Sequence, residues 1–86
     1  MSVTDRAIAQ AIIDAVDARG PDKTCCPSEI ARSLAHDPTW RDLMPRVRDV
    51  AADLARQGRI RISRGGKTVD PSNLSGGPVR FGPPGS

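Results

Sequence analysis

The chain has 86 residues, which is room for one domain with one small core, and a chain this short buries only about 60–65% of its unfolded surface. Aromatic residues make up 2% of it and hydrophobic residues 37%, so the core must come mainly from aliphatic side chains, and a deep substrate cavity is not expected. The net charge of +3 is unevenly placed, because residues 1–38 carry 4 basic and 6 acidic side chains whereas residues 39–86 carry 9 and 4.

The first expected element is an amphipathic helix over residues 5–18. Thr4 is suited to the N-cap position before it. Apolar side chains then recur at helical spacing, at Ile8, Ala11, Ile12, Ala15 and Val16. Gly20 and Pro21 end the helix, because glycine can take the left-handed C′ conformation and proline cannot continue a helix.

A second, shorter helix is expected over residues 27–35. Cys26 takes the N-cap position and Pro27 the first helical position, while Glu29 is placed to reach back to the capping backbone in a capping box. Ile30, Ala31 and Leu34 form the stripe that this helix would bury.

The third helix is expected over residues 45–57, after an irregular stretch. A short helical segment near residues 38–43 is predicted around Trp40, followed by a break, because Pro45 biases the residue before it away from the helical region. The helix itself would bury Val47, Val50, Ala51 and Leu54. Gly58 would end it.

A strand over residues 59–63 follows, because polar and apolar residues alternate from Arg59 to Ser63, with Ile60 and Ile62 toward the core. Gly65-Gly66 suits a hairpin turn that needs positive φ at both positions. The returning strand is residues 67–69, residues 79–81, or both. Residues 1–81 are expected to form one domain and residues 82–86 a disordered tail.

The order of these elements over residues 4–81 resembles a winged helix-turn-helix, an α+β fold. More closely, the runs GPDKTCCPSEIARSL, TWRDLMPRVRDVAADLARQGRIRIS, KTVDP and GGPVRF resemble a bacterial family, the domain of unknown function 3253 family. The resemblance implies the winged-helix fold, with a short strand at residues 23–25 paired to the wing, and no established activity. The turn from His36 to Met44 is longer than the three or four residues of a simple helix-turn-helix.

Binding of duplex DNA would require cations on the third helix and on the wing, because helix side chains reach the major groove and flanking cations neutralise phosphates. The candidate nucleic-acid-binding side chains are Arg41, Arg46, Arg48, Arg59, Arg61, Arg64 and Lys67. Of these, Arg46 and Arg48 could also read guanine from the start of the helix. DNA binding is therefore the expected function.

The alternative is a protein-binding adaptor. Arg46, Asp49, Asp53 and Arg56 fall on one stripe of the third helix, where such residues commonly form stabilising ion pairs, and two carboxylates there would repel phosphate. An adaptor would use the same helix and wing, or the apolar edge around Trp40 and Met44, to hold a protein partner. Trp40 itself is expected to close the core in preference to serving as an exposed stacking platform.

Other kinds of site find little support. Cys25, Cys26 and His36 lack the partners that a zinc site needs, so no metal or cofactor is expected, and the two cysteines are interpreted as structural thiols. No nucleophile, base and orienting group stand together, so an enzyme is not expected. Adjacent free thiols imply a reducing compartment, and no apolar run is long enough for a signal or a membrane span, so we expect a cytoplasmic monomer or weak homodimer.

Overall fold

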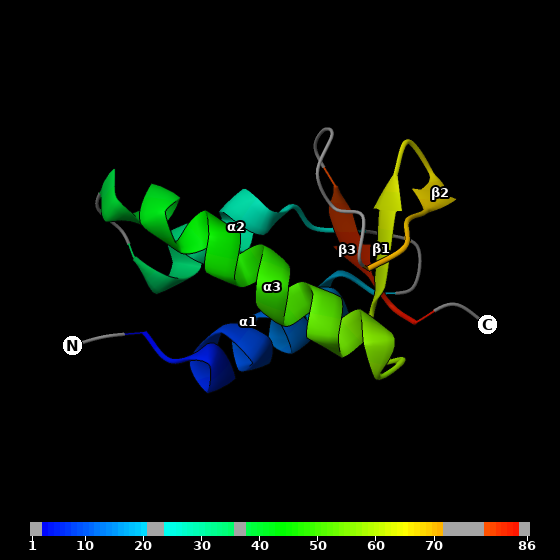
Figure 1. The fold of residues 1–86 in the computed structure, drawn as a ribbon, viewed down its shortest axis with the longest axis horizontal. Helices are drawn as coiled ribbons and strands as arrows, with labels where there is room; N and C mark the ends of the chain where they lie inside the picture. Colours follow the sequence, from blue (N-terminus) through cyan, green and yellow to red (C-terminus); the bar gives the residue numbers. More distant parts are fainter. Residues whose placement is uncertain (1–2, 21–23, 36–37, 72–78, 85–86) are drawn as a thin grey trace.

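Three helices pack beside a small antiparallel sheet in the computed structural model, which describes residues 3–20, 24–35, 38–71 and 79–84. The elements are α1 (Asp5–Arg19), α2 (Pro27–Leu34), the 3-10 helix η1 (Pro38–Leu43), α3 (Met44–Arg56), β1 (Arg61–Arg64), β2 (Lys67–Thr68) and β3 (Arg80–Gly82). Figure 1 shows the helices gathered together and the sheet beyond the C-terminal end of α3. The α+β class is confirmed, and the arrangement is winged-helix-like. Among the described helices, none is long and apolar enough to cross a membrane.

Helix α1 begins at the predicted cap and ends one residue later than predicted. The Thr4 hydroxyl accepts a hydrogen bond from the Ala7 amide at 3.1 Å, and Ile8, Ile12 and Val16 line the buried face. Gly20 has φ +83° and ψ −179°, a backbone conformation that favours glycine.

The capping box predicted for α2 is wrong. Cys26 and Pro27 occupy the predicted N-cap and N1 positions, but the Cys26 side chain makes no capping hydrogen bond. The Glu29 carboxylate instead forms an ion pair with Arg19 in the last turn of α1. A guanidinium is a stronger partner for a carboxylate than a neutral backbone amide, so this contact joins two helices in place of capping one.

The predicted break before Pro45 is also wrong, because η1 continues directly into α3. Leu43 has helical backbone angles of φ −82° and ψ −16°, and α3 begins at Met44. Proline in the first turn of a helix removes no intrahelical hydrogen bond, since its amide would have had no partner there. Its steric bias on Met44 is overcome by packing, because Trp40, Leu43 and Met44 all lie against the core.

Helix α3 buries Val47, Val50, Ala51 and Leu54 as predicted. Its end is a Schellman motif, in which the Gly58 amide donates to the Ala55 carbonyl at 3.0 Å and the Arg59 amide donates to the Leu54 carbonyl at 2.9 Å. Gly58 has φ +76° there. Because this motif includes Arg59, β1 starts two residues later than the predicted strand.

The sheet has the order β2-β1-β3, so both candidate returning strands pair with β1. Ser63 lies opposite Thr68 on one side and Arg80 on the other, and Ile62 lies opposite Phe81. The turn between β1 and β2 is Gly65-Gly66, with φ of +59° and +84°, as its sequence predicted. Strand β3 reaches Gly82, one residue into the segment expected to be a tail.

The segment before α2 joins the sheet through one residue. Cys25 forms an isolated antiparallel bridge with Phe81, with backbone hydrogen bonds of 2.9 and 2.7 Å in the two directions. Of the strand predicted at residues 23–25, residue 23 lies outside the described residues. The bridge places the chain between α1 and α2 along the free edge of β3.

The core lies between the helices and the inner face of the sheet. Ile8 and Ile12 from α1, Ile30 from α2 and Val47 from α3 are fully buried with Phe81 from β3. Phe81 is the largest of the fully buried side chains, and it is the one large ring at the centre of an aliphatic core.

Removal of the Phe81 ring should therefore destabilise the protein more than any neighbouring change in the sheet. We expect Phe81→Ala to lower the free energy of unfolding by about 3–5 kcal/mol through lost burial and the cavity left behind. Urea denaturation followed by circular dichroism measures this loss. Thr68→Ala, an exposed change in the same sheet, is the control and should alter stability by no more than about 0.5 kcal/mol. Similar losses for the two variants would contradict the assigned core.

Candidate nucleic-acid interface

The structure divides the predicted DNA-contacting cations into two groups. Arg41, Arg46 and Arg48 lie on η1 and the first turns of α3, whereas Arg59, Arg61, Arg64 and Lys67 follow the other end of α3. The part of α3 that follows Arg48, residues 49–56, separates the two groups by about 12 Å along the helix axis. Figure 1 shows this separation, with the sheet at the far end of α3 from η1.

The arginines at the start of α3 are engaged with the protein itself. The Arg46 guanidinium binds the Asp5 carboxylate at 2.8 and 3.2 Å, which ties α3 to the start of α1. The Arg48 side chain is half-buried, and its Nε is shielded from solvent without a hydrogen-bond partner in the described part of the chain. Neither side chain projects freely from the outer surface of α3.

The outer surface of α3 instead carries more negative than positive charge. Its exposed stripe is Pro45, Asp49, Asp53 and Arg56, and Arg56 pairs with Asp53 at 3.0 Å. Arg46, which was expected on this stripe, lies half-buried at its edge. Two carboxylates on this surface oppose the approach of phosphate, so α3 is poorly suited to entering a DNA groove.

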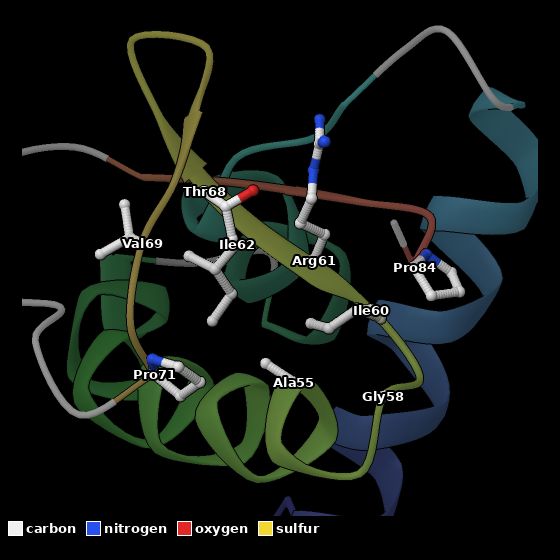
Figure 2. Close-up of a pocket in the computed structure, with 9 residues that line it drawn as sticks. All are labelled: Ala55, Gly58, Ile60, Arg61, Ile62, Thr68, Val69, Pro71 and Pro84. Carbon is white, nitrogen blue, oxygen red and sulfur yellow. The ribbon is translucent and has the colours of Figure 1, made fainter. Parts of the chain in front are cut away.

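The outer face of the sheet is the more basic surface. Figure 2 shows Arg61 pointing away from α3, while Ile60 and Ile62 point toward it. By the register of the strands, Arg61, Ser63, Thr68 and Arg80 share this outer face, with Ser63 directly between Thr68 and Arg80. Two exposed guanidinium groups and the exposed Thr68 hydroxyl therefore gather on one side of a three-stranded sheet, around the buried Ser63.

Arg80 is the member of this face that sequence reasoning missed. Its Nε donates to the Thr24 hydroxyl at 2.5 Å and its Nη2 donates to the Thr24 carbonyl at 3.0 Å, so the guanidinium is held in place while it stays exposed. Val79 and Phe81 on either side are buried. That alternation was visible in the sequence and would have placed Arg80 outward, had residues 79–81 been assigned firmly to the sheet.

The rest of the basic group lies around the hairpin. Arg59 and Lys67 are exposed and Arg64 is half-buried. Residues 59–86 contain 5 basic side chains and 1 acidic side chain, Asp70, whereas residues 1–58 contain 8 and 9. The positive charge of the whole chain therefore comes from the sheet and its flanks.

An open groove of about 430 Å³ separates the hairpin from the end of α3 (Figure 2). Its lining is mostly apolar, and Arg61 and Thr68 are its polar side chains. The lining residues are Ala55, Gly58, Ile60, Arg61, Ile62, Thr68, Val69, Pro71 and Pro84.

The sequence matches the family described as Protein of unknown function (DUF3253) over residues 5–84. The chain belongs to this family. The match confirms the family resemblance seen in the sequence motifs, and it includes all the helices and strands, Arg80 and the groove. No curated protein matches the chain.

The two cysteines are free thiols in different surroundings. Cys25 is fully buried, and this burial, with a smaller effect from Glu29, raises the pKa of its thiol from 9.0 to about 11. Cys26 is half-buried at the start of α2, with its sulfur 3.0 Å from the Ser28 hydroxyl. Within the described residues, no three His, Cys, Asp or Glu side chains gather as a metal site. His36 lies outside the described residues.

The thiols should differ in reactivity. In the Cys26→Ser variant we expect Cys25 to react with Ellman's reagent only as fast as the protein opens, because the buried, protonated thiol is not a nucleophile. In the Cys25→Ala variant, the half-buried Cys26 should react without that delay. Rapid modification of Cys25 in the folded protein would contradict its burial.

The raised pKa of Cys25 also predicts a loss of stability in alkaline solution. The folded state holds the thiol proton more tightly than the unfolded state, so the stabilising effect is full below pH 9 and is lost as the pH rises to about 11. Urea denaturation should show a loss of up to about 2–3 kcal/mol in the Cys26→Ser background over this range. Adding Cys25→Ala to the Cys26→Ser variant should remove the loss of stability between pH 9 and about 11. The same dependence of stability on pH in the single and the double variant would contradict the raised pKa of Cys25.

Proposed function

We propose that this chain is a small winged-helix module that binds duplex DNA, and that its sheet makes the principal contacts with the phosphate backbone. The observation that supports this proposal is the charge of the strands. They contain Arg61, Arg64, Lys67 and Arg80 and no aspartate or glutamate. In many helix-turn-helix proteins the corresponding helix reads the bases. Here α3 contributes less to DNA contact than the sheet does, because its outer stripe carries Asp49 and Asp53.

The chemistry of the outer face suits phosphate. Guanidinium groups bind phosphate oxygens through two parallel N–H donors, and the exposed Thr68 hydroxyl adds a further donor to the phosphate backbone. The contact of Arg80 with Thr24 uses two of its five donors and fixes the group before any ligand arrives. Contacts of this kind position a protein on DNA without reading its sequence, so the proposed binding has little base specificity.

The salt dependence of binding tests the proposal. Fluorescence anisotropy of a labelled duplex should show binding whose log affinity falls by about 0.9 per neutralised phosphate for each unit of log salt concentration. Arg61→Ala should weaken binding to all sequences and reduce that slope by about one unit. Arg56→Ala, which removes the same charge from the outer stripe of α3, is the matched control and should leave the slope unchanged.

Two results would overturn this assignment. No binding at low salt, even at high micromolar protein, would remove DNA as the ligand. Equal effects of Arg56→Ala and Arg61→Ala on the slope would show that net charge alone, rather than the sheet, governs binding.

A further inference from the structure

A second basic site lies at the end of the molecule away from the sheet. The guanidinium carbon of Arg32, from α2, is 4.5 Å from the centroid of the Trp40 ring in η1, and that of Arg41 is 5.4 Å from it. Both arginines are exposed and Trp40 is half-buried. We call Arg32, Trp40 and Arg41 the tryptophan cluster.

Among the described residues, neither charge of this cluster forms an ion pair with an acidic side chain. The ion pairs formed between described residues are Arg19 with Glu29, Arg46 with Asp5 and Arg56 with Asp53, so neither Arg32 nor Arg41 takes part in one. A cation–π contact at an exposed site is weak and leaves the formal charge of each guanidinium in place. The fold thus brings two like charges to one ring, and no ion pair between the residues that the structure describes neutralises them, which favours an anion there.

The indole also prepares the arginines for a planar ligand. A guanidinium that lies over an aromatic ring keeps the donors at its edge available, and its orientation is partly fixed before binding. Carboxylates match the guanidinium fork through two parallel hydrogen bonds. The cluster therefore offers two oriented forks around one apolar ring.

Apolar side chains adjoin these forks. Residues three apart eclipse in a 3-10 helix, so Trp40 and Leu43 lie on the same side of η1. Leu34, at the end of α2, and Met44, at the start of α3, are also partly buried against the core. A ligand at the cluster would meet both positive charge and hydrophobic surface.

We propose that the tryptophan cluster binds an acidic peptide segment of a protein partner, with its carboxylates on Arg32 and Arg41 and its apolar side chains against Trp40 and Leu43. The charge of the cluster selects an anion, and its apolar surroundings favour a peptide over a phosphate backbone. A nucleic-acid base would stack on Trp40 at the place that the guanidinium groups occupy. The site goes beyond the proposed DNA-binding function and leaves the sheet free.

Trp40 is the one tryptophan of the chain, so its fluorescence reports directly on this site. The full-length protein is titrated with a synthetic peptide of alternating glutamate and leucine, and with the same peptide carrying glutamine for glutamate. We expect a saturable change in emission with the acidic peptide only. Calorimetry run in parallel detects binding that leaves the emission unchanged.

Variants locate the binding. Arg32→Gln and Arg41→Gln should each lower the affinity for the acidic peptide about tenfold or more, because each removes a charged hydrogen-bond pair. Arg6→Gln, an exposed change of the same charge on α1, and Arg61→Ala in the sheet should leave peptide binding unchanged. Circular dichroism confirms that each variant is folded.

Three outcomes overturn the proposal. One is no saturable binding by either measurement, and another is equal binding of the glutamine peptide. The third is a Trp40 response to inorganic phosphate or a DNA duplex at lower concentration than to the acidic peptide, which would make the cluster a phosphate site. Because DNA binding is tested through Arg61, a failure of one proposal is distinguishable from a failure of the other.

Discussion

The pairing of Phe81 on both sides of its strand is the interaction on which the rest of the fold depends. Phe81 lies opposite Ile62 in β1 and exchanges two backbone hydrogen bonds with Cys25, so one residue joins the wing to the segment between α1 and α2. Its ring is fully buried among the helices. Successive side chains in a strand alternate between faces, so an inward Phe81 requires an outward Arg80. The core thus determines where the proposed phosphate contacts lie.

The arginines of the helices and those of the strands differ in their acidic partners. Arg19 and Arg46 each join two helices through a carboxylate, Glu29 and Asp5 respectively, and are therefore committed to the fold. Such exposed pairs contribute at most about 1 kcal/mol each, yet they remove these arginines from the cations available to a ligand. The strands have no carboxylates, and Arg61, Lys67 and Arg80 are exposed on them. Whether an arginine lies beside an acidic side chain therefore matters more than the total charge of its segment. An arginine paired with a carboxylate stabilises the fold, and an arginine away from carboxylates is suited to contact a ligand.

Local patterns predicted most of the fold, because local chemistry decides it. The cap at Thr4, the glycine at the end of α3 and the Gly65-Gly66 turn are formed by residues close in sequence, and the bounds of the helices differ from prediction by one residue. The errors at the candidate site arose from contacts across the chain. Arg46 meets Asp5 across 41 positions and Arg80 meets Thr24 across 56, and no spacing rule relates such residues. The sequence therefore predicted the place of Arg61 in the candidate site, but neither the part played by Arg80 nor the pairing of Arg46 with Asp5.

The same distinction explains why different ligands are proposed for the two basic surfaces of this small domain. On the sheet, the exposed Arg61 and Arg80 adjoin buried side chains in their strands and share one face with the exposed Thr68, an array of donors suited to a repeating phosphate backbone. In the tryptophan cluster, two arginines meet at one ring with aliphatic side chains close by, a compact arrangement suited to a short segment with both charged and apolar groups. α3 joins the sites, and its acidic outer stripe resists phosphate between them. A duplex bound to the sheet as proposed would therefore be discouraged from extending along the helix, which would leave the cluster to the proposed peptide.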